Sequence, residues 1–131
     1  MNEKQQEMIY KFSIFEQQMR QIQEQLQAVE QGILELNELN KGLEELKGKN
    51  GNEILAPVGR GIFAKAKLLS EDLIVDIGGK KFVKKTIPQT EEMIDKQIKK
   101  LEDIYGQLTK SLDDLNEEVM KLIEEAEGSK N

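Results

Sequence analysis

The order of apolar and polar residues divides the chain into two helical segments and a middle segment of a different kind. From about residue 3 to 47 and from 88 to 127, apolar residues recur three and four positions apart among Glu, Gln and Lys. This is the period of a helix. Between Glu53 and Ile87 the period changes to two, and glycine-bearing turns separate short apolar runs. Such a change predicts β-hairpins between two helices.

In the first helical segment the apolar positions form one narrow seam, in alternating steps of four and three. Its members are Met8, Phe12, Phe15, Met19, Ile22, Leu26, Val29, Ile33 and Leu36. A seam of this width is typical of a coiled coil rather than of a helix in a globular core. One continuation runs through Asn40 to Leu43, with Asn40 as a polar residue that sets the register. The other runs through Leu39, Leu43 and Leu46, which would locally overwind the helix.

The second helical segment has a seam of its own, again in steps of four and three. Its members are Ile94, Ile98, Leu101, Tyr105, Leu108, Leu112, Leu115, Val119, Leu122 and Ala126. Thr86 and Gln89 have the spacing of a capping box, and Pro88 suits the first helical turn. Residues 128 to 131 are expected to be frayed.

The two seams are expected to pack against each other in an antiparallel pair. Each helix has about 40 residues and is therefore roughly 60 Å long. A register that places Val29 beside Tyr105 brings the seams together along their whole length. The two termini then lie together, far from the hairpins, in a chain expected to be a single unit from residue 1 to 131.

Four short strands in two hairpins are expected in the middle segment. Their expected ranges are 54–58, 62–69, 73–77 and 82–86. Pro57 suits only an edge or a bulge, and Gly78-Gly79-Lys80 indicates a tight hairpin turn. Hairpins this small are marginal in water alone, and they present unpaired edges.

We call residues 53 to 87 the hub and expect it to drive assembly. Because helices occupy the rest of the chain, other copies or homologous subunits must pair with the hairpin edges, closing sheets or barrels between chains. The apolar hub residues expected to form these contacts are Ile54, Leu55, Val58, Ile62, Phe63, Leu68, Leu73, Val75, Ile77, Phe82 and Val83.

The free end of the helix pair carries more apolar residues than a two-helix seam needs. We call this set the tip; it comprises Met8, Ile9, Phe12, Ile14, Phe15, Met120, Leu122 and Ile123. Ile9, Ile14, Met120 and Ile123 fall outside the seams and should be partly exposed. Exposed apolar clusters usually mark interaction sites, and flexible methionines suit adaptable binding. Alternatively, these residues thicken the seam at its end or contact neighbouring subunits.

The amino-acid composition disfavours several kinds of site and partner. The chain has no cysteine and no histidine, which removes the thiolate nucleophile, the commonest general base and the commonest metal ligands. No metal site, cofactor or catalytic residue is therefore expected. The net charge of −6 argues against nucleic acid as a partner. No apolar run reaches about 18 residues and no signal core is present, so we expect a soluble cytoplasmic protein.

Three polar features are interpreted as surface rather than as sites. Gly78-Gly79-Lys80-Lys81 resembles a phosphate loop only superficially, because Ile74 stands where that motif requires a glycine. Lys80, Lys81, Lys84 and Lys85 form a basic patch, and a solvated strand face or an inter-subunit contact is favoured over nucleic acid. Paired carboxylates in the second helix lack the oxygen-rich loop of a calcium site.

The hub, with its sequence EILAPVGRGIFAKAKLLSEDLIVDIGGKKFVKKTI between two long helices, resembles the α-class subunit of archaeal-type prefoldin. The most specific parts of the resemblance are residues 55–59, 63–67 and 75–78. With two hairpins, the chain is similar to α-class subunits, whereas β-class subunits carry a single hairpin. The layout of the whole chain fits, but only the hub is specific in sequence.

The resemblance implies a hexamer of two α-class and four β-class subunits. In that family the hubs form a double β-barrel from which six coiled-coil arms extend. The arm tips hold non-native polypeptides without ATP and pass them to a group II chaperonin in the cytosol. By location, the client-binding residues would be those of the tip. The carboxylates near the end of the second helix could then attract the chaperonin.

Two rival functions follow from the same residues. A coiled-coil structural or filament-forming protein could use the same hub for assembly. An enzyme with its site in the hub is disfavoured, because histidine and cysteine are absent and the hub has only 35 residues.

Overall fold

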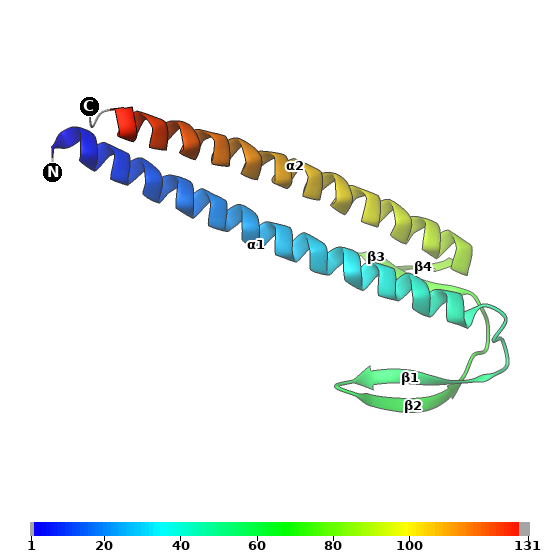
Figure 1. The fold of residues 1–131 in the computed structure, drawn as a ribbon. Helices are drawn as coiled ribbons and strands as arrows, with labels where there is room; N and C mark the ends of the chain where they lie inside the picture. Colours follow the sequence, from blue (N-terminus) through cyan, green and yellow to red (C-terminus); the bar gives the residue numbers. More distant parts are fainter. Residues whose placement is uncertain (1, 129–131) are drawn as a thin grey trace. The chain divides into compact units, whose positions relative to one another are not determined.

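The computed structural model describes residues 2 to 128 and has two long helices with four short strands between them in sequence (Figure 1). In chain order the elements are α1 (Glu3–Leu46), β1 (Glu53–Gly59), β2 (Ile62–Lys67), β3 (Leu73–Gly78), β4 (Lys81–Lys85) and α2 (Ile87–Gly128). The predicted combination of two long helices and two small antiparallel strand pairs is confirmed. Of the residues expected to be frayed, Gly128 belongs to α2, and residues 129 to 131 lie outside the described range.

The chain forms two compact units, which are described separately. The tip unit contains α1 as far as Ile33 and α2 from Lys100 onwards, and the hub unit contains Leu34–Lys99. In the tip unit the two helical segments run side by side in opposite directions (Figure 1). They approach closely at Gly32, where a Cβ atom would lie 3.2 Å from Leu101 Cδ1.

Both helices begin with reciprocal hydrogen bonds between side chains and backbone. At α1 the Gln5 N–H donates to Asn2 Oδ1 at 2.8 Å, and the Asn2 N–H donates to Gln5 Oε1 at 3.3 Å. At α2 the Thr86 N–H donates to Gln89 Oε1 at 3.0 Å, and the Gln89 N–H donates to Thr86 Oγ1 at 3.2 Å. The predicted capping box of α2 is therefore confirmed, and it fixes the end of the hub.

Apart from Ile87 and Thr90 at the start of α2, the buried residues of both helices follow the predicted seams. Ile94 is only 1% exposed, and Leu43 and Ile98 are also buried. Between Leu36 and Leu43 the seam passes through Asn40, which is half-buried, whereas Leu39 is 50% exposed. The continuation through Leu39 is therefore wrong, and the polar residue lies on the seam.

Three polar contacts between α1 and α2 agree with the predicted antiparallel register. In the hub unit, Asn40 Nδ2 donates to Asp95 Oδ1 at 2.9 Å, and Lys47 Nζ lies 2.9 Å from Glu91 Oε1. In the tip unit, the Tyr105 hydroxyl donates to Glu30 Oε1 at 3.0 Å. Tyr105 therefore faces Glu30, next to the Val29 that the seam register predicted.

The hairpins form two separate two-stranded antiparallel sheets, β1–β2 and β3–β4. Five of the eight expected strand ends differ from the observed ones by one residue, and the end of β2 differs by two. β2 ends at Lys67 rather than at residue 69, because its partner strand begins only at Glu53, after a turn in which Gly51 has a φ of 85°. β4 ends at Lys85 because Thr86 caps α2. Pro57 adjoins a bulge, as its missing N–H requires.

The second hairpin repeats the first 19 residues later along the chain. Leu55 pairs with Lys65 as Ile74 pairs with Lys84, and Phe63 occupies the position of Phe82. Both hairpins have their register shift just before the turn. Both then close through two residues with positive φ, Arg60-Gly61 and Gly79-Lys80. Positive φ at both central positions matches the twist of a two-residue hairpin.

Candidate functional site

The hub hairpins leave most of their large apolar side chains uncovered. Of the residues predicted to form contacts, the exposed ones are Leu55, Val58, Ile62, Phe63, Ile77 and Phe82. The half-buried ones are Ile54, Leu68, Leu73, Val75 and Val83. Within residues 2 to 128, neither sheet gains a third strand, so each hairpin keeps its outer edges unpaired. Apolar faces combined with open edges are the features of a surface that pairs with another chain.

Sequence reasoning missed two exposed apolar residues of the hub, Ile74 and Leu69. Ile74 is 74% exposed and lies opposite Lys84 on β4, and Leu69 follows β2 in the connection to β3. A strict period of two selected Leu73, Val75 and Ile77 as the contact face of β3. The signal that could have found Ile74 is the unbroken apolar run at residues 73 to 75, which indicates a strand that is apolar on both faces.

The basic patch lies on the second hairpin and its turn. Lys80 has a φ of 61° in that turn, and Lys81 and Lys84 are exposed on β4. The Gly78 N–H donates to Asp76 Oδ1 at 2.8 Å. This is a strand-to-strand turn and not the strand-to-helix loop that holds a phosphate, so the sequence-based interpretation as a hairpin turn is confirmed.

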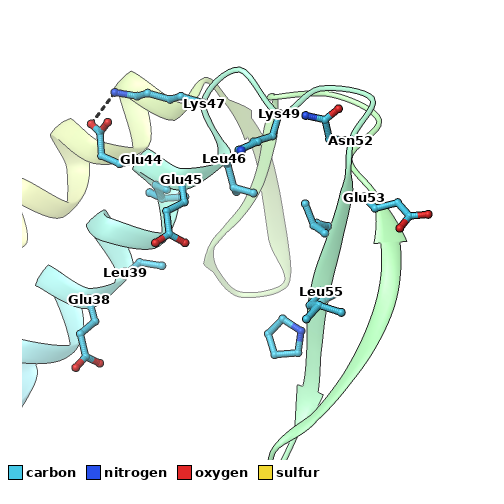
Figure 2. A pocket seen from close by; sticks show the side chains of 15 residues that line it. Glu38, Leu39, Glu44, Glu45, Leu46, Lys47, Lys49, Asn52, Glu53 and Leu55 are labelled. Atoms are coloured by element: carbon cyan, nitrogen blue, oxygen red, sulfur yellow. Dashed lines mark hydrogen bonds and ion pairs between the residues drawn. The ribbon is translucent and has the colours of Figure 1, made fainter.

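An open groove of about 1160 Å³ lies between the end of α1 and β1 in the hub unit (Figure 2). Its apolar wall includes Leu39, Leu46 and Leu55. At its rim Lys47 Nζ lies 2.7 Å from Glu44 Oε1. Their hydrogen bond lowers the pKa of Glu44 below its ordinary 4.5 and raises the pKa of Lys47 above its ordinary 10.5. The groove was not predicted, because it depends on how β1 returns past the helix.

In the tip, the structure separates surface residues from seam residues. Ile9 and Met120 are exposed, at 53% and 59%. The half-buried residues are Met8, Phe12, Ile14, Phe15 and Ile123. Leu122 is only 5% exposed, so it belongs to the seam and offers little surface to a ligand. Ile9 and Met120 are thus the most exposed members of the tip.

Two kinds of feature are absent from the described part of the chain. Between residues 2 and 128 no three acidic side chains gather as metal ligands would. In the same range no helix has both the length and the apolar character needed to cross a bilayer.

Comparison with protein families identifies the kind of protein that has this layout. The family model described as prefoldin subunit matches residues 15–131. The chain belongs to the prefoldin family. The match includes both hairpins and all of α2, but it begins at Phe15, so the first four tip residues lie outside it.

Relatives place the chain in the α class of prefoldin. It is 35% identical over 92 residues to prefoldin subunit alpha of Methanobrevibacter smithii, covering 70% of this chain and 63% of the relative. It is 26% identical over 92 residues to prefoldin subunit alpha of Methanosphaera stadtmanae, covering 70% of this chain and 67% of that relative. The aligned region thus spans about two thirds of the relatives' length.

A solved structure supports the fold. A cryo-EM structure of filamentous prefoldin from Methanocaldococcus jannaschii matches with a TM-score of 0.77 at 21% identity, covering 87% of this chain and 96% of that chain. At this identity the likeness concerns the fold alone. The resemblance of the hub to prefoldin α-class subunits is therefore confirmed, and the chain is a member of a chaperone family.

Proposed function

We propose that this chain is a non-enzymatic subunit of an ATP-independent holdase that binds non-native polypeptides at its tip. The observation that carries the proposal is the apolar surface left over once the seams are formed, with Ile9 and Met120 more than half exposed. Unfolded chains expose apolar segments that such a surface can cover. Methionine adapts to varied shapes, which suits clients of no fixed sequence.

Assembly through the hub is the second part of the proposal. Each hairpin alone is too small to be stable, and its exposed apolar faces favour pairing with other subunits. We expect the partners to be β-class subunits, in an assembly of two α-class and four β-class chains in which the hubs close into barrels. In the cytoplasm, the assembly would deliver its clients to a group II chaperonin.

The test of the client site removes the tip and keeps the hub. A chain shortened to residues 18 to 116 should still assemble but should no longer suppress the aggregation of an unfolded client. A matched full-length variant with Ile9→Ser and Met120→Ser should show the same loss with both helices intact. Full protection by the shortened chain would contradict the proposal.

Delivery to a chaperonin needs a test of its own. If carboxylates near the end of α2 attract the chaperonin, exchanging Glu124 and Glu125 for Gln should weaken the affinity, most clearly at low salt. An unchanged affinity would show that these side chains take no part in delivery.

A structural role is the second candidate function. The observation that favours it is the fold match to a prefoldin that the solved structure describes as filamentous. A filament subunit would use the same hub but would have no need of the tip. Electron microscopy of the purified chain, alongside the aggregation assay, would separate the two: filaments without client protection would favour the structural role.

A further inference from the structure

On α2, the exposed side chain of Met120 lies among carboxylates of the same helix. Residues three and four positions apart on a helix are neighbours on its surface. Met120 therefore has Glu117 on one side and Glu124 on the other, and half-buried Ile123 has Glu127 beside it. All three of these glutamates are exposed. Any ligand that covers Met120 consequently lies against negative charge.

Few basic side chains accompany these carboxylates at the end of α2. The last sixteen described residues carry one basic side chain, Lys121. Their carboxylates are Asp113, Asp114, Glu117, Glu118, Glu124, Glu125 and Glu127. Within residues 2 to 128 none of these seven carboxylates is within ion-pair distance of a lysine or arginine. The electrostatic field of these carboxylates therefore extends into the solvent, where it acts on an approaching ligand.

We infer that the tip selects apolar segments flanked by lysine or arginine over equally apolar segments flanked by acidic residues. The inference rests on the proposed function and names the class of client. Burial of the apolar segment against Ile9 and Met120 would supply most of the affinity. Cationic flanks would be attracted by Glu117, Glu124 and Glu127, whereas acidic flanks would be repelled.

Charge complementarity also decides against other occupants of this surface. An anionic lipid surface or a nucleic acid would meet the same repulsion as an acidic peptide. A basic amphipathic segment satisfies both features of the tip, its apolar side chains and its surrounding carboxylates. Unfolded chains can present such segments because their apolar residues are not yet buried.

The experiment compares two labelled peptides that share one apolar core and differ only in lysine or glutamate flanks. Binding to the assembled full-length protein is followed by fluorescence anisotropy at about 0.05 M and 0.5 M salt, because the screening length falls from more than about 10 Å to less than about 8 Å between these concentrations. The lysine-flanked peptide should bind about threefold to thirtyfold more tightly at low salt, and high salt should narrow the difference.

Matched variants assign the effect to particular side chains. The triple variant Glu117→Gln, Glu124→Gln and Glu127→Gln should lose most of the preference. The control variant Glu38→Gln, Glu102→Gln and Asp103→Asn removes the same charge from elsewhere on the helices, and it should retain the preference. A full-length variant with Ile9→Ser and Met120→Ser should bind both peptides weakly.

The possible outcomes separate this inference from the proposed function. Equal binding of the two peptides, lost in the Ile9 and Met120 variant, would overturn the charge preference but leave the holdase intact. If the Ile9 and Met120 variant binds both peptides as tightly as the unsubstituted protein does, the charge preference and the proposed holdase function are both overturned. A change in assembly mass in the triple variant would show that the tip contacts another subunit, which would also overturn the inference.

Discussion

At the scale of single residues, backbone conformation separates a glycine that the fold needs from one that it only tolerates. Gly78 has a φ of 108° next to the bulge of the second hairpin, where any other residue is strained. Gly106 lies on the exposed side of α2, and a Cβ atom there would meet nothing within 4 Å. The same substitution at the two positions should therefore have opposite effects.

We expect Gly78→Ala to destabilise the hub by about 1–3 kcal/mol, and Gly106→Ala to stabilise the protein by about 0.5–1 kcal/mol. Thermal unfolding of the two variants beside the unsubstituted protein measures both effects. A stabilising Gly78→Ala would show that the turn relaxes to a different backbone conformation.

The hydrogen bond between Tyr105 and Glu30 should be visible in the titration of the phenol. Because its hydroxyl donates to a carboxylate, the pKa of Tyr105 is raised above its ordinary 10.0. The stability contributed by this bond is present at neutral pH and is lost as pH rises through that raised pKa.

A titration of Tyr105 alone tests the contact. In a Tyr10→Phe background Tyr105 is the sole tyrosine, and adding Glu30→Gln should lower the pKa that its absorbance reports. No change on adding Glu30→Gln would contradict the contact.

At the scale of elements, periodicity was sufficient for the helices but not for the strands. Both seams, the capping box at Thr86 and the turn at Gly79-Lys80 follow from local patterns, and the structure confirms them. The end of β2 depends on where β1 begins, and the exposure of Ile74 depends on which face of its hairpin is covered. These are tertiary properties, and the local sequence carries only a weak signal for them.

Asn40 provides a test of how the helix pair sets its register. Its side chain lies on the seam, and its Oδ1 is buried without a hydrogen-bond partner in the described chain. Asn40→Leu should therefore raise the free energy of unfolding by about 1 kcal/mol, because it removes an unpaired buried acceptor. Leu39→Ala, at a half-exposed position off the seam, should change it little. Urea unfolding of both variants checks this, and destabilisation by Asn40→Leu would show that the bond to Asp95 dominates.

The repeated hairpins should make equivalent contributions to assembly. Phe63 and Phe82 occupy matching positions and are exposed to similar extents. Phe63→Ser and Phe82→Ser should therefore reduce the mass of the assembly by similar amounts, with a larger loss in the double variant. Tyr10→Ser, an exposed aromatic outside the hub, is the control and should leave the mass unchanged. A large effect of only one phenylalanine would show that the hairpins bind different partners.

At the scale of the whole molecule, the sequence supports the family more strongly than it supports any single site. The hub motif predicted a prefoldin α-class subunit, and the family match confirms it. The tip residues have no motif, and Met8, Ile9, Phe12 and Ile14 precede the matched region. Their role could be inferred only because the tip has more apolar residues than the seam needs. Subunit contacts depend on a second chain's surface, so the organisation of the assembly stays a prediction.

The measurement that tests the account most directly is the mass of the full-length chain at micromolar concentration, alone and with candidate β-class subunits. The account predicts a folded species much heavier than one chain, in which hydrogen exchange at the hairpin amides slows on assembly. Cooperative unfolding and protected hairpin amides in a species with the mass of a single chain would contradict it, because the hub would then be stable without neighbours.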